Sequence, residues 1–270
     1  MALIINEDSL TYLLTMQAGS IDVVVTSPRY NFGKNYPGVS DKTPMEDYFK
    51  EMTRLGSGLL HVVKDDGVIF LNVGCRAANP LHDVNVAQCF LDAGWVLQER
   101  IIWQKADENG NGHFTPINSK IYLNNLWESI FLLSKKGDVE LDRLAIGVPY
   151  KDQSNIKRWK RGNSVHCRGD VWFIPYETIQ SRERDRAGHE AIFPRELVVR
   201  CLRLVEKGRI GLTVLDPCCG IGTVPCIAEE QGHIGIGIEL STCIALAARS
   251  NLKMSEADRR RVLHNKGDEK

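Results

Sequence analysis

Two short segments, far apart in the sequence, carry residue types that could do chemistry together. The first is Asp216-Pro217-Cys218-Cys219-Gly220-Ile221-Gly222-Thr223, which lies between an expected strand and an expected helix. Its glycines let the backbone approach a ligand closely, and the helix directs its first N–H groups to the same place. Glu239 ends the next expected strand, where a carboxylate can accept both hydroxyls of a ribose. These features predict a site for a nucleoside cofactor.

Two details of this turn indicate which cofactor it binds. A dinucleotide-binding turn needs a third glycine, and the chain has Pro225 at that position. Asp216 would repel a pyrophosphate but could hold a cationic amino-acid group. S-Adenosylmethionine carries such a group and no phosphate, so it is the predicted cofactor, and a nicotinamide-dependent oxidoreductase is disfavoured. Taken alone, the turn also fits a plain strand–turn–helix connection.

The second segment, Ser27-Pro28-Arg29-Tyr30, directly follows a β-branched, apolar run at residues 21–26. Such a run is typical of a strand covered on both faces, and its carboxyl end lies where open α/β sheets bind ligands. Pro28 fixes the backbone and aims its own carbonyl and the Ser27 hydroxyl, while Tyr30 offers a ring on which a base can stack. Two acceptors and a ring describe a pocket for a planar amine. The tetrapeptide alone also fits a capped strand end with a half-buried tyrosine.

The elements that position both segments alternate between strands and helices. Apolar patterning predicts strands at residues 3–5, 21–26, 68–73, 95–104, 127–134, 213–215 and 233–238. It predicts helices at residues 9–17, 45–63, 84–93, 194–206, 224–231 and 241–252, with a turn at Asp65-Asp66-Gly67. This alternation predicts an α/β fold with a Rossmann-like, doubly wound sheet of parallel strands, in which both chemical segments reach one edge.

Several motifs, in the same order, resemble those of the beta class of DNA amino-methyltransferases. The catalytic motif of that class, Asp/Asn/Ser-Pro-Pro-aromatic, is similar to residues 27–30, and its cofactor motif, Asp-Pro-Phe-x-Gly-x-Gly-Thr, is similar to residues 216–223. The segments at residues 4–10, 169–175 and 188–194 also resemble family segments. The resemblance covers residues 4–252 and implies a methyltransferase fold. It departs at Arg29, which replaces the second proline, and at Cys218, which replaces the phenylalanine.

The resemblance implies a role for each matching residue. Ser27 Oγ and the Pro28 carbonyl would accept the amino hydrogens of a flipped base, and Tyr30 would stack on that base. Methyl transfer would be direct and in line, driven by positioning and electrostatics rather than by attack of a cysteine. The remaining matching residues would surround S-adenosylmethionine, with Asp8 at its adenine, Glu239 at its ribose, and further contacts from Phe193, Asp216, Cys218, Gly220, Gly222 and Thr223.

A serine at the first motif position resembles the enzymes that methylate N4 of cytosine. The predicted function is therefore site-specific cytosine-N4 methylation of double-stranded DNA, as in restriction–modification systems, and N6-adenine methylation is the alternative. A DNA-binding relative that is weakened in catalysis is a second alternative, because Arg29 brings conformational freedom and charge to the base pocket. An RNA or protein-glutamine methyltransferase is disfavoured by a basic segment and by Gly169-Asp170-Val171-Trp172.

That basic segment lies in an irregular stretch in which target recognition is expected. This region, residues 136–187, would separate a catalytic part of the core at residues 1–135 from a cofactor-binding part at residues 188–270. Residues 156–168 hold five basic residues and no acid, which suits contact with phosphates but also fits a solvated charged loop. The loop at residues 31–44 is expected to close over the substrate strand. The candidate DNA contacts are Arg29, Lys34, Lys157, Arg158, Lys160, Arg161 and Arg168.

Composition bounds the remaining possibilities. Thirty-four Lys and Arg balance 34 Asp and Glu, so contact with DNA must come from a local patch rather than from net charge. The eight cysteines form no Cys-x-x-Cys pair, so we expect reduced thiols and no metal site. No apolar run approaches the length of a membrane span, and the first residues lack a signal-peptide pattern. We therefore expect a cytoplasmic protein without a membrane partner, either a monomer or a homodimer.

Overall fold

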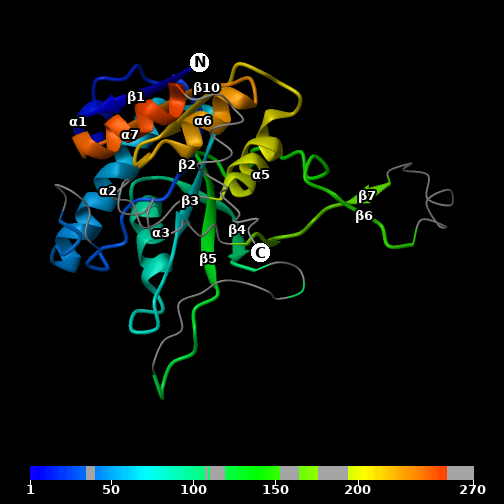
Figure 1. Ribbon diagram of the computed structural model, residues 1–270, viewed down its shortest axis with the longest axis horizontal. Helices are drawn as coiled ribbons and strands as arrows, with labels where there is room; N and C mark the ends of the chain where they lie inside the picture. Colours follow the sequence, from blue (N-terminus) through cyan, green and yellow to red (C-terminus); the bar gives the residue numbers. More distant parts are fainter. Residues whose placement is uncertain (35–39, 107–108, 110–118, 153–163, 176–193, 254–270) are drawn as a thin grey trace, which may run out of the picture.

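One mixed sheet organises the chain and places the two chemical segments on neighbouring strands. The computed structural model describes residues 1–34, 40–106, 109, 119–152, 164–175 and 194–253. Within them, eight strands form this sheet (Figure 1), in the spatial order β1 (Ala2–Asn6), β10 (Ile234–Glu239), β9 (Thr213–Asp216), β2 (Ile21–Thr26), β3 (Val63–Val73), β5 (Trp127–Ser134), β4 (Val96–Gln104) and β8 (Val171–Phe173).

Most of these strands run in one direction, as the sequence predicts. Strands β1, β10, β9, β2 and β3 are parallel, and β4 and β8 are parallel to each other. Strand β5 is antiparallel to both of its neighbours, so the expectation of an all-parallel sheet is wrong at this strand, while the doubly wound α/β fold class is confirmed. The described residues between β4 and β5 form no helix, and only a crossover connection makes consecutive strands parallel.

Both faces of the sheet are buried, which explains why the central strands are apolar at nearly every position. Val23, Val25 and Phe70 point to one face, and Val24 and Ile69 point to the other. Burying one such side chain contributes about 1.5–3 kcal/mol. The first face is covered by α5 (Arg195–Glu206) and α6 (Thr223–Glu230), with α7 (Thr242–Lys253) beside α6, and the second by α1 (Ser9–Leu13), α2 (Met45–Val62) and α3 (His82–Asp92).

Two local expectations are corrected by the structure. Strand β3 runs through Asp65-Asp66-Gly67, where the sequence predicts a turn. The register with β2 shifts there, from Ile21 opposite Val63 to Val23 opposite Val68, so an irregularity within the ladder absorbs the extra residues. Helix α1 ends at Leu13 rather than at Gln17, because the chain must turn back into β2 through Gly19, which has φ 61°.

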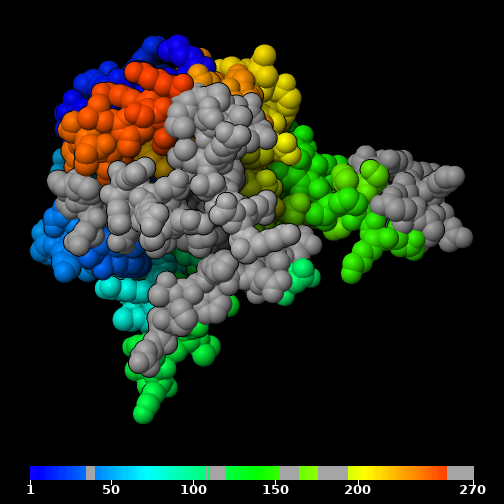
Figure 2. All heavy atoms as spheres, in the orientation of Figure 1, coloured from blue at the N-terminus to red at the C-terminus, as the bar shows by residue number. Residues whose placement is uncertain are grey.

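Two segments project from this body, as Figures 1 and 2 show. One is an arm formed by β6 (Val148–Pro149) and β7 (Val165–His166), which pair antiparallel to each other. The other is the described stretch at residues 119–126, which leads into β5. Between the arm and the core, β8 joins the sheet beside β4, although three residues are too few for sequence patterning to detect. The expected recognition region therefore contains both a projecting arm and an edge strand of the core.

Helix α6 approaches strand β10 so closely that the strand needs a glycine. A Cβ atom on Gly235 would lie 2.4 Å from the Pro225 carbonyl oxygen and 2.6 Å from Pro225 Cα. Pro225 stands where a dinucleotide-binding turn has its third glycine, whose role there is close packing of helix on strand. In this protein the facing strand supplies the small residue instead of the helix.

Gly235→Ala should therefore lower the free energy of unfolding by about 1–3 kcal/mol, because backbone atoms cannot move aside as the end of a flexible side chain can. Urea or thermal unfolding measures the change. Ile234→Ala is a control on the same strand, since it trims a side chain that is 39% exposed and should cost less. A Gly235→Ala protein as stable as the parent would contradict this account of the packing.

Candidate active site

The two chemical segments meet at one edge of the sheet. Strand β2 pairs directly with β9, and because the two are parallel they end at the same edge. Thr26, the last residue of β2, donates a hydrogen bond through Oγ1 to Asp216 Oδ1 at the end of β9, over 2.8 Å. Both side chains are buried. The expected convergence of the catalytic and cofactor motifs is thus confirmed.

The turn after β9 depends on its glycines. Gly220 has φ 52° and Gly222 has φ 84°, a region that side-chain-bearing residues rarely adopt. The turn is closed by a 2.8 Å hydrogen bond from Gly222 N to the Cys219 carbonyl, and α6 begins at the next residue, Thr223. The result is a tight backbone curve that leads directly into a helix N-terminus, as the sequence predicts.

Glu239 braces this turn from the neighbouring strand. Its Oε2 accepts a hydrogen bond from Gly220 N over 3.0 Å, and its Oε1 accepts one from Ser241 N over 2.8 Å. The Glu239 carbonyl accepts from Glu7 N over 3.2 Å, which brings the end of β1 alongside. The next residue, Asp8, caps helix α1 by accepting from Thr11 N over 2.9 Å. The carboxylates of Asp8 and Glu239 therefore stand at the ends of adjacent strands.

Burial sets the charge state of these groups. It raises the pKa of Asp216 to about 7, against hydrogen bonds from Cys218 N and Thr26, and the charge of Glu239 adds to the rise. Burial also raises the pKa of Glu239, although backbone N–H donors from Ser241 and Gly220 oppose it. Burial, with Asp216 and Glu239 nearby, raises the pKa of the Cys218 and Cys219 thiols. These two cysteines therefore line the site as neutral thiols and not as nucleophiles.

The catalytic loop after β2 is tied together by its own side chains. Ser27 Oγ lies 2.8 Å from Tyr30 Oη. Tyr30 Oη in turn lies 3.0 Å from Glu128 Oε2 on β5 and 3.2 Å from Asn72 Oδ1 on β3. The Tyr30 ring packs edge-on against Phe32, with their centroids 5.6 Å apart. Ser27 is therefore held at the sheet edge by a tyrosine that is itself anchored to two strands.

Arg29, which replaces a proline of the family motif, lies against helix α2. Its guanidinium forms an ion pair with Glu51 and donates a 3.1 Å hydrogen bond to the Ser40 carbonyl. Tyr48 donates to the Arg29 carbonyl over 2.8 Å, and its ring faces the guanidinium. In this arrangement the charge of Arg29 is matched by a carboxylate. Its contact with DNA stays a prediction.

Asp41 holds the start of the loop that follows. Its carboxylate is 3% exposed and accepts from three backbone N–H groups at 2.9–3.0 Å, those of Asn31, Phe32 and Lys34. Asn31 has φ 57°, a strained conformation that this network stabilises. Lys34 is thereby placed on a fixed part of the loop, but its contact with DNA and the closure of the loop over a substrate stay predictions.

Other predicted site residues lie elsewhere or cannot be placed. Arg168 follows β7, and its Nε donates to the Ile146 carbonyl over 3.0 Å. The sequence reasoning missed Asn72, Lys105 and Glu128, of which Glu128 carried one detectable signal, an acid at the second position of a strand that is otherwise apolar. Five predicted residues fall outside the described part of the chain, namely Lys157, Arg158, Lys160, Arg161 and Phe193.

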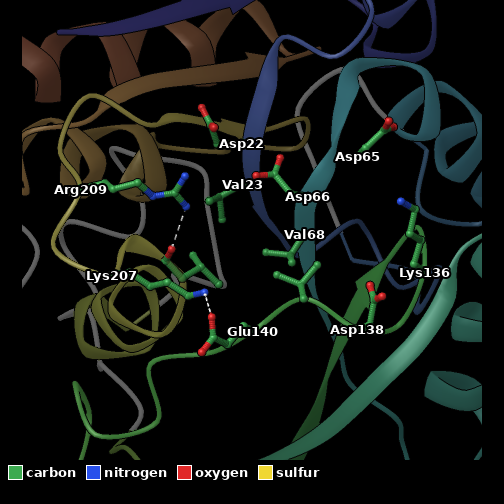
Figure 3. Close-up of a pocket in the computed structure, with 12 residues that line it drawn as sticks. Asp22, Val23, Asp65, Asp66, Val68, Lys136, Asp138, Glu140, Lys207 and Arg209 are labelled. Atoms are coloured by element: carbon green, nitrogen blue, oxygen red, sulfur yellow. Dashed lines mark hydrogen bonds and ion pairs between the residues drawn. The ribbon is translucent and has the colours of Figure 1, made fainter.

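A second hollow, of about 560 Å³, opens at the opposite edge of the sheet, near the amino ends of β2 and β3 (Figure 3). Its acids are paired, since Asp22 binds Lys64 at 2.6 Å and Glu140 binds Lys207 at 2.8 Å. The remaining labelled lining residues include Val23, Val68, Asp138 and Arg209. Because Ser27 and Asp216 lie at the other ends of these strands, the hollow is separate from the candidate active site.

Comparison with known proteins defines the class. The DNA methylase family of N6/N4 methyltransferases matches residues 21–249, so the chain belongs to this family of S-adenosylmethionine-dependent DNA amino-methyltransferases. Among curated relatives, the type II methyltransferase M.BglII of Bacillus subtilis is 27% identical over 249 residues, which cover 88% of this chain but 65% of that protein. The chain thus spans about two thirds of the length of M.BglII.

Solved structures share the fold over nearly the whole chain. The cytosine-N4-specific PvuII DNA methyltransferase has a TM-score of 0.69 at 17% identity, covering 97% of this chain and 92% of that one. A DNA modification methylase of Thermus thermophilus, in complex with S-adenosylmethionine, has a TM-score of 0.63 at 22% identity, covering 97% and 95%. The predicted methyltransferase fold is confirmed by these similarities. Within the described residues, no helix combines the length and apolar character that crossing a membrane requires.

The Arg29–Glu51 ion pair should stabilise the catalytic loop. Its side chains are 17% and 36% exposed, so a double-mutant cycle with Arg29→Ala and Glu51→Ala should give a coupling energy of about 1 kcal/mol in unfolding. The exposed pair of Lys50 and Glu46 on the same helix, with side chains 63% and 81% exposed, is the matched control and should couple less. Equal coupling in the two cycles would show that Arg29 does not anchor the loop.

Proposed function

We propose that this chain transfers a methyl group from S-adenosylmethionine to N4 of a flipped cytosine in double-stranded DNA. The observation that carries the proposal is the 2.8 Å hydrogen bond between Thr26 and Asp216, because it joins the strand that ends in Ser27 to the strand that ends in the glycine turn. An amine held by the first segment can therefore face a methyl donor held by the second. Family membership supports the reaction type, and Ser27 at the first position of its motif supports cytosine over adenine.

The residues around the turn fit the proposed cofactor. Gly220 and Gly222 give a close backbone approach at a helix N-terminus, and Asp216 is a buried acid that a cationic ammonium group would stabilise in its ionised form. Glu239 and Asp8, at the ends of adjacent strands, suit the ribose hydroxyls and the adenine. Cys218 and Thr223 complete the wall. When bound, S-adenosylmethionine supplies a methyl group activated by its sulfonium centre.

The chain itself contributes positioning. We infer that Ser27 Oγ and the Pro28 carbonyl accept the two N–H groups of the exocyclic amine and so orient its lone pair. Tyr30 lies beside them and offers its ring to a base that has left the duplex. Because Arg29 is paired with Glu51, its charge does not face the amine without a counterion, which supports an active enzyme over a weakened DNA-binding relative.

We further propose that residues 136–187 read the target sequence. The β6–β7 arm projects from the core within this region (Figure 1), and residues 157–168 bring it basic side chains. Residues 1–135 and 188–270 would then form the catalytic and cofactor-binding parts of one core. The type II relative supports a place in a restriction–modification system, acting on DNA in the cytoplasm.

The test of this function is methylation of mixed-sequence DNA with labelled S-adenosylmethionine, followed by mass spectrometry of the nucleosides. We expect N4-methylcytosine. N6-Methyladenine would instead support the adenine alternative, and retention of DNA without any transfer would support the weakened relative.

Ser27→Ala should reduce the rate of methyl transfer on the order of 100-fold, because it removes one of the acceptors that orient the amine. The affinity for S-adenosylmethionine should stay within about twofold, since Ser27 lies on the base side of the site. Ser57→Ala, an exposed serine of α2, is the matched control. Equal rates for the Ser27→Ala and parent proteins would exclude this role for the hydroxyl.

Binding of S-adenosylmethionine should depend on pH through Asp216. Its raised pKa, about 7, leaves the carboxyl largely protonated below that pH, whereas pairing with a cationic ammonium group needs the ionised form. Binding should therefore release a proton and weaken by up to about tenfold per pH unit as the pH falls below 7. Calorimetric titration between about pH 5.5 and 7.5 measures this dependence.

Asp216→Asn is the control for this titration, because the amide keeps the shape of the side chain and cannot ionise. Its affinity should be lower near pH 7 and nearly independent of pH. An unchanged slope in Asp216→Asn would assign the proton to another group.

A further inference from the structure

The Ser27 hydroxyl lies at one end of a chain of hydrogen bonds that continues into the sheet. Ser27 Oγ is 2.8 Å from Tyr30 Oη, which is 3.0 Å from Glu128 Oε2. Lys105 Nζ donates to the other carboxylate oxygen, Glu128 Oε1, over 2.6 Å. The chain thus connects the catalytic loop after β2 to the residue that follows β4 and to the start of β5.

The groups beyond Ser27 fix the direction of this chain. A carboxylate has no proton to give, so Tyr30 must donate to Glu128. Asn72 offers Tyr30 a second acceptor, Oδ1 at 3.2 Å, because its Nδ2 donates to the Ser129 carbonyl over 3.1 Å. Burial raises the pKa of Tyr30, and the charge of Glu128 adds to the rise, so the phenol keeps the proton that it donates. Its oxygen is left to accept the proton of Ser27.

The surroundings favour an ionised Glu128. The side chains of Glu128 and Lys105 are 12% and 20% exposed, so their ion pair is shielded from water and keeps the acid charged. Gly74 leaves room for this contact, since a Cβ atom there would lie 2.9 Å from Tyr30 Cε2 and 3.0 Å from Glu128 Oε1. A charged acceptor also makes the hydrogen bond from Tyr30 stronger than one to a neutral group.

We propose that Glu128 is a positioning residue that acts through Tyr30 to turn the Ser27 hydroxyl proton away from the base. Ser27 Oγ then presents only lone pairs to the exocyclic amine, and it accepts an N–H. A serine proton that pointed the other way would bind the lone pair of the amine and hold back its attack on the methyl group. This inference rests on the proposed function, because it assigns a task to the same site.

Glu128→Gln tests the inference with little change of shape. Lys105 needs an acceptor and would take the amide oxygen, so the amide N–H group would face Tyr30 and reverse the chain. The rate constant for methyl transfer in a single turnover should fall about tenfold or more, the effect of losing one hydrogen bond to a charged group. The KM for DNA and the Kd for S-adenosylmethionine should change by less than about twofold. Glu99→Gln, the same change at an exposed position of β4, is the matched control.

The second arm of the experiment separates positioning from a general structural role. In a Tyr30→Phe background, the route from Glu128 to Ser27 is cut, so Glu128→Gln should cause no further loss of rate. An equal loss in both backgrounds would overturn the inference, as would a Glu128→Gln protein with the parental rate. If the parent protein transfers no methyl group to DNA, the proposed function fails and the inference fails with it. Parental transfer that is insensitive to Glu128→Gln overturns the inference alone.

Discussion

The direct pairing of β2 with β9 is the constraint on which the rest of this site depends. It brings together two strand ends that are separated by most of the chain, and the hydrogen bond from Thr26 to Asp216 locks their relative position. In-line transfer needs reacting atoms held within a few tenths of an ångström, and a parallel ladder provides such rigidity more reliably than loops do. The helices on both faces serve this arrangement by excluding water from the paired strands.

The same constraint places acids in an apolar environment. Asp216 and Glu239 end adjacent strands at the cofactor turn, and burial raises the pKa of both. In the unliganded chain, this cost is partly offset by backbone N–H donors at Cys218, Gly220 and Ser241. A cationic ligand would offset more of it, because an ammonium group favours the ionised carboxylate. Desolvation that weakens the isolated chain thus becomes part of the affinity for a cationic cofactor.

Sequence reasoning reached the fold class, most elements and the convergence of the two motifs, because each depends on local pattern or on the known behaviour of parallel strands. It missed the antiparallel direction of β5, since an apolar run such as residues 130–133 reads the same in either direction. It also missed Asn72, Lys105 and Glu128. These residues come from three different strands or strand ends, and only the register between β3, β4 and β5 brings them to Tyr30. Register between distant segments is not written in any local pattern.

The departures from the family motif become understandable once side-chain partners are considered. A second proline would stiffen the catalytic loop through its ring, whereas here Arg29 reaches Glu51 and Tyr48 on α2, and Tyr30 reaches β3 and β5. The loop is thus held from outside rather than from within its own backbone. External anchoring of this kind makes the loop depend on the tertiary structure, so that its geometry forms only when α2 and the sheet have packed. It also explains how a motif that has lost a rigid residue can keep a defined geometry.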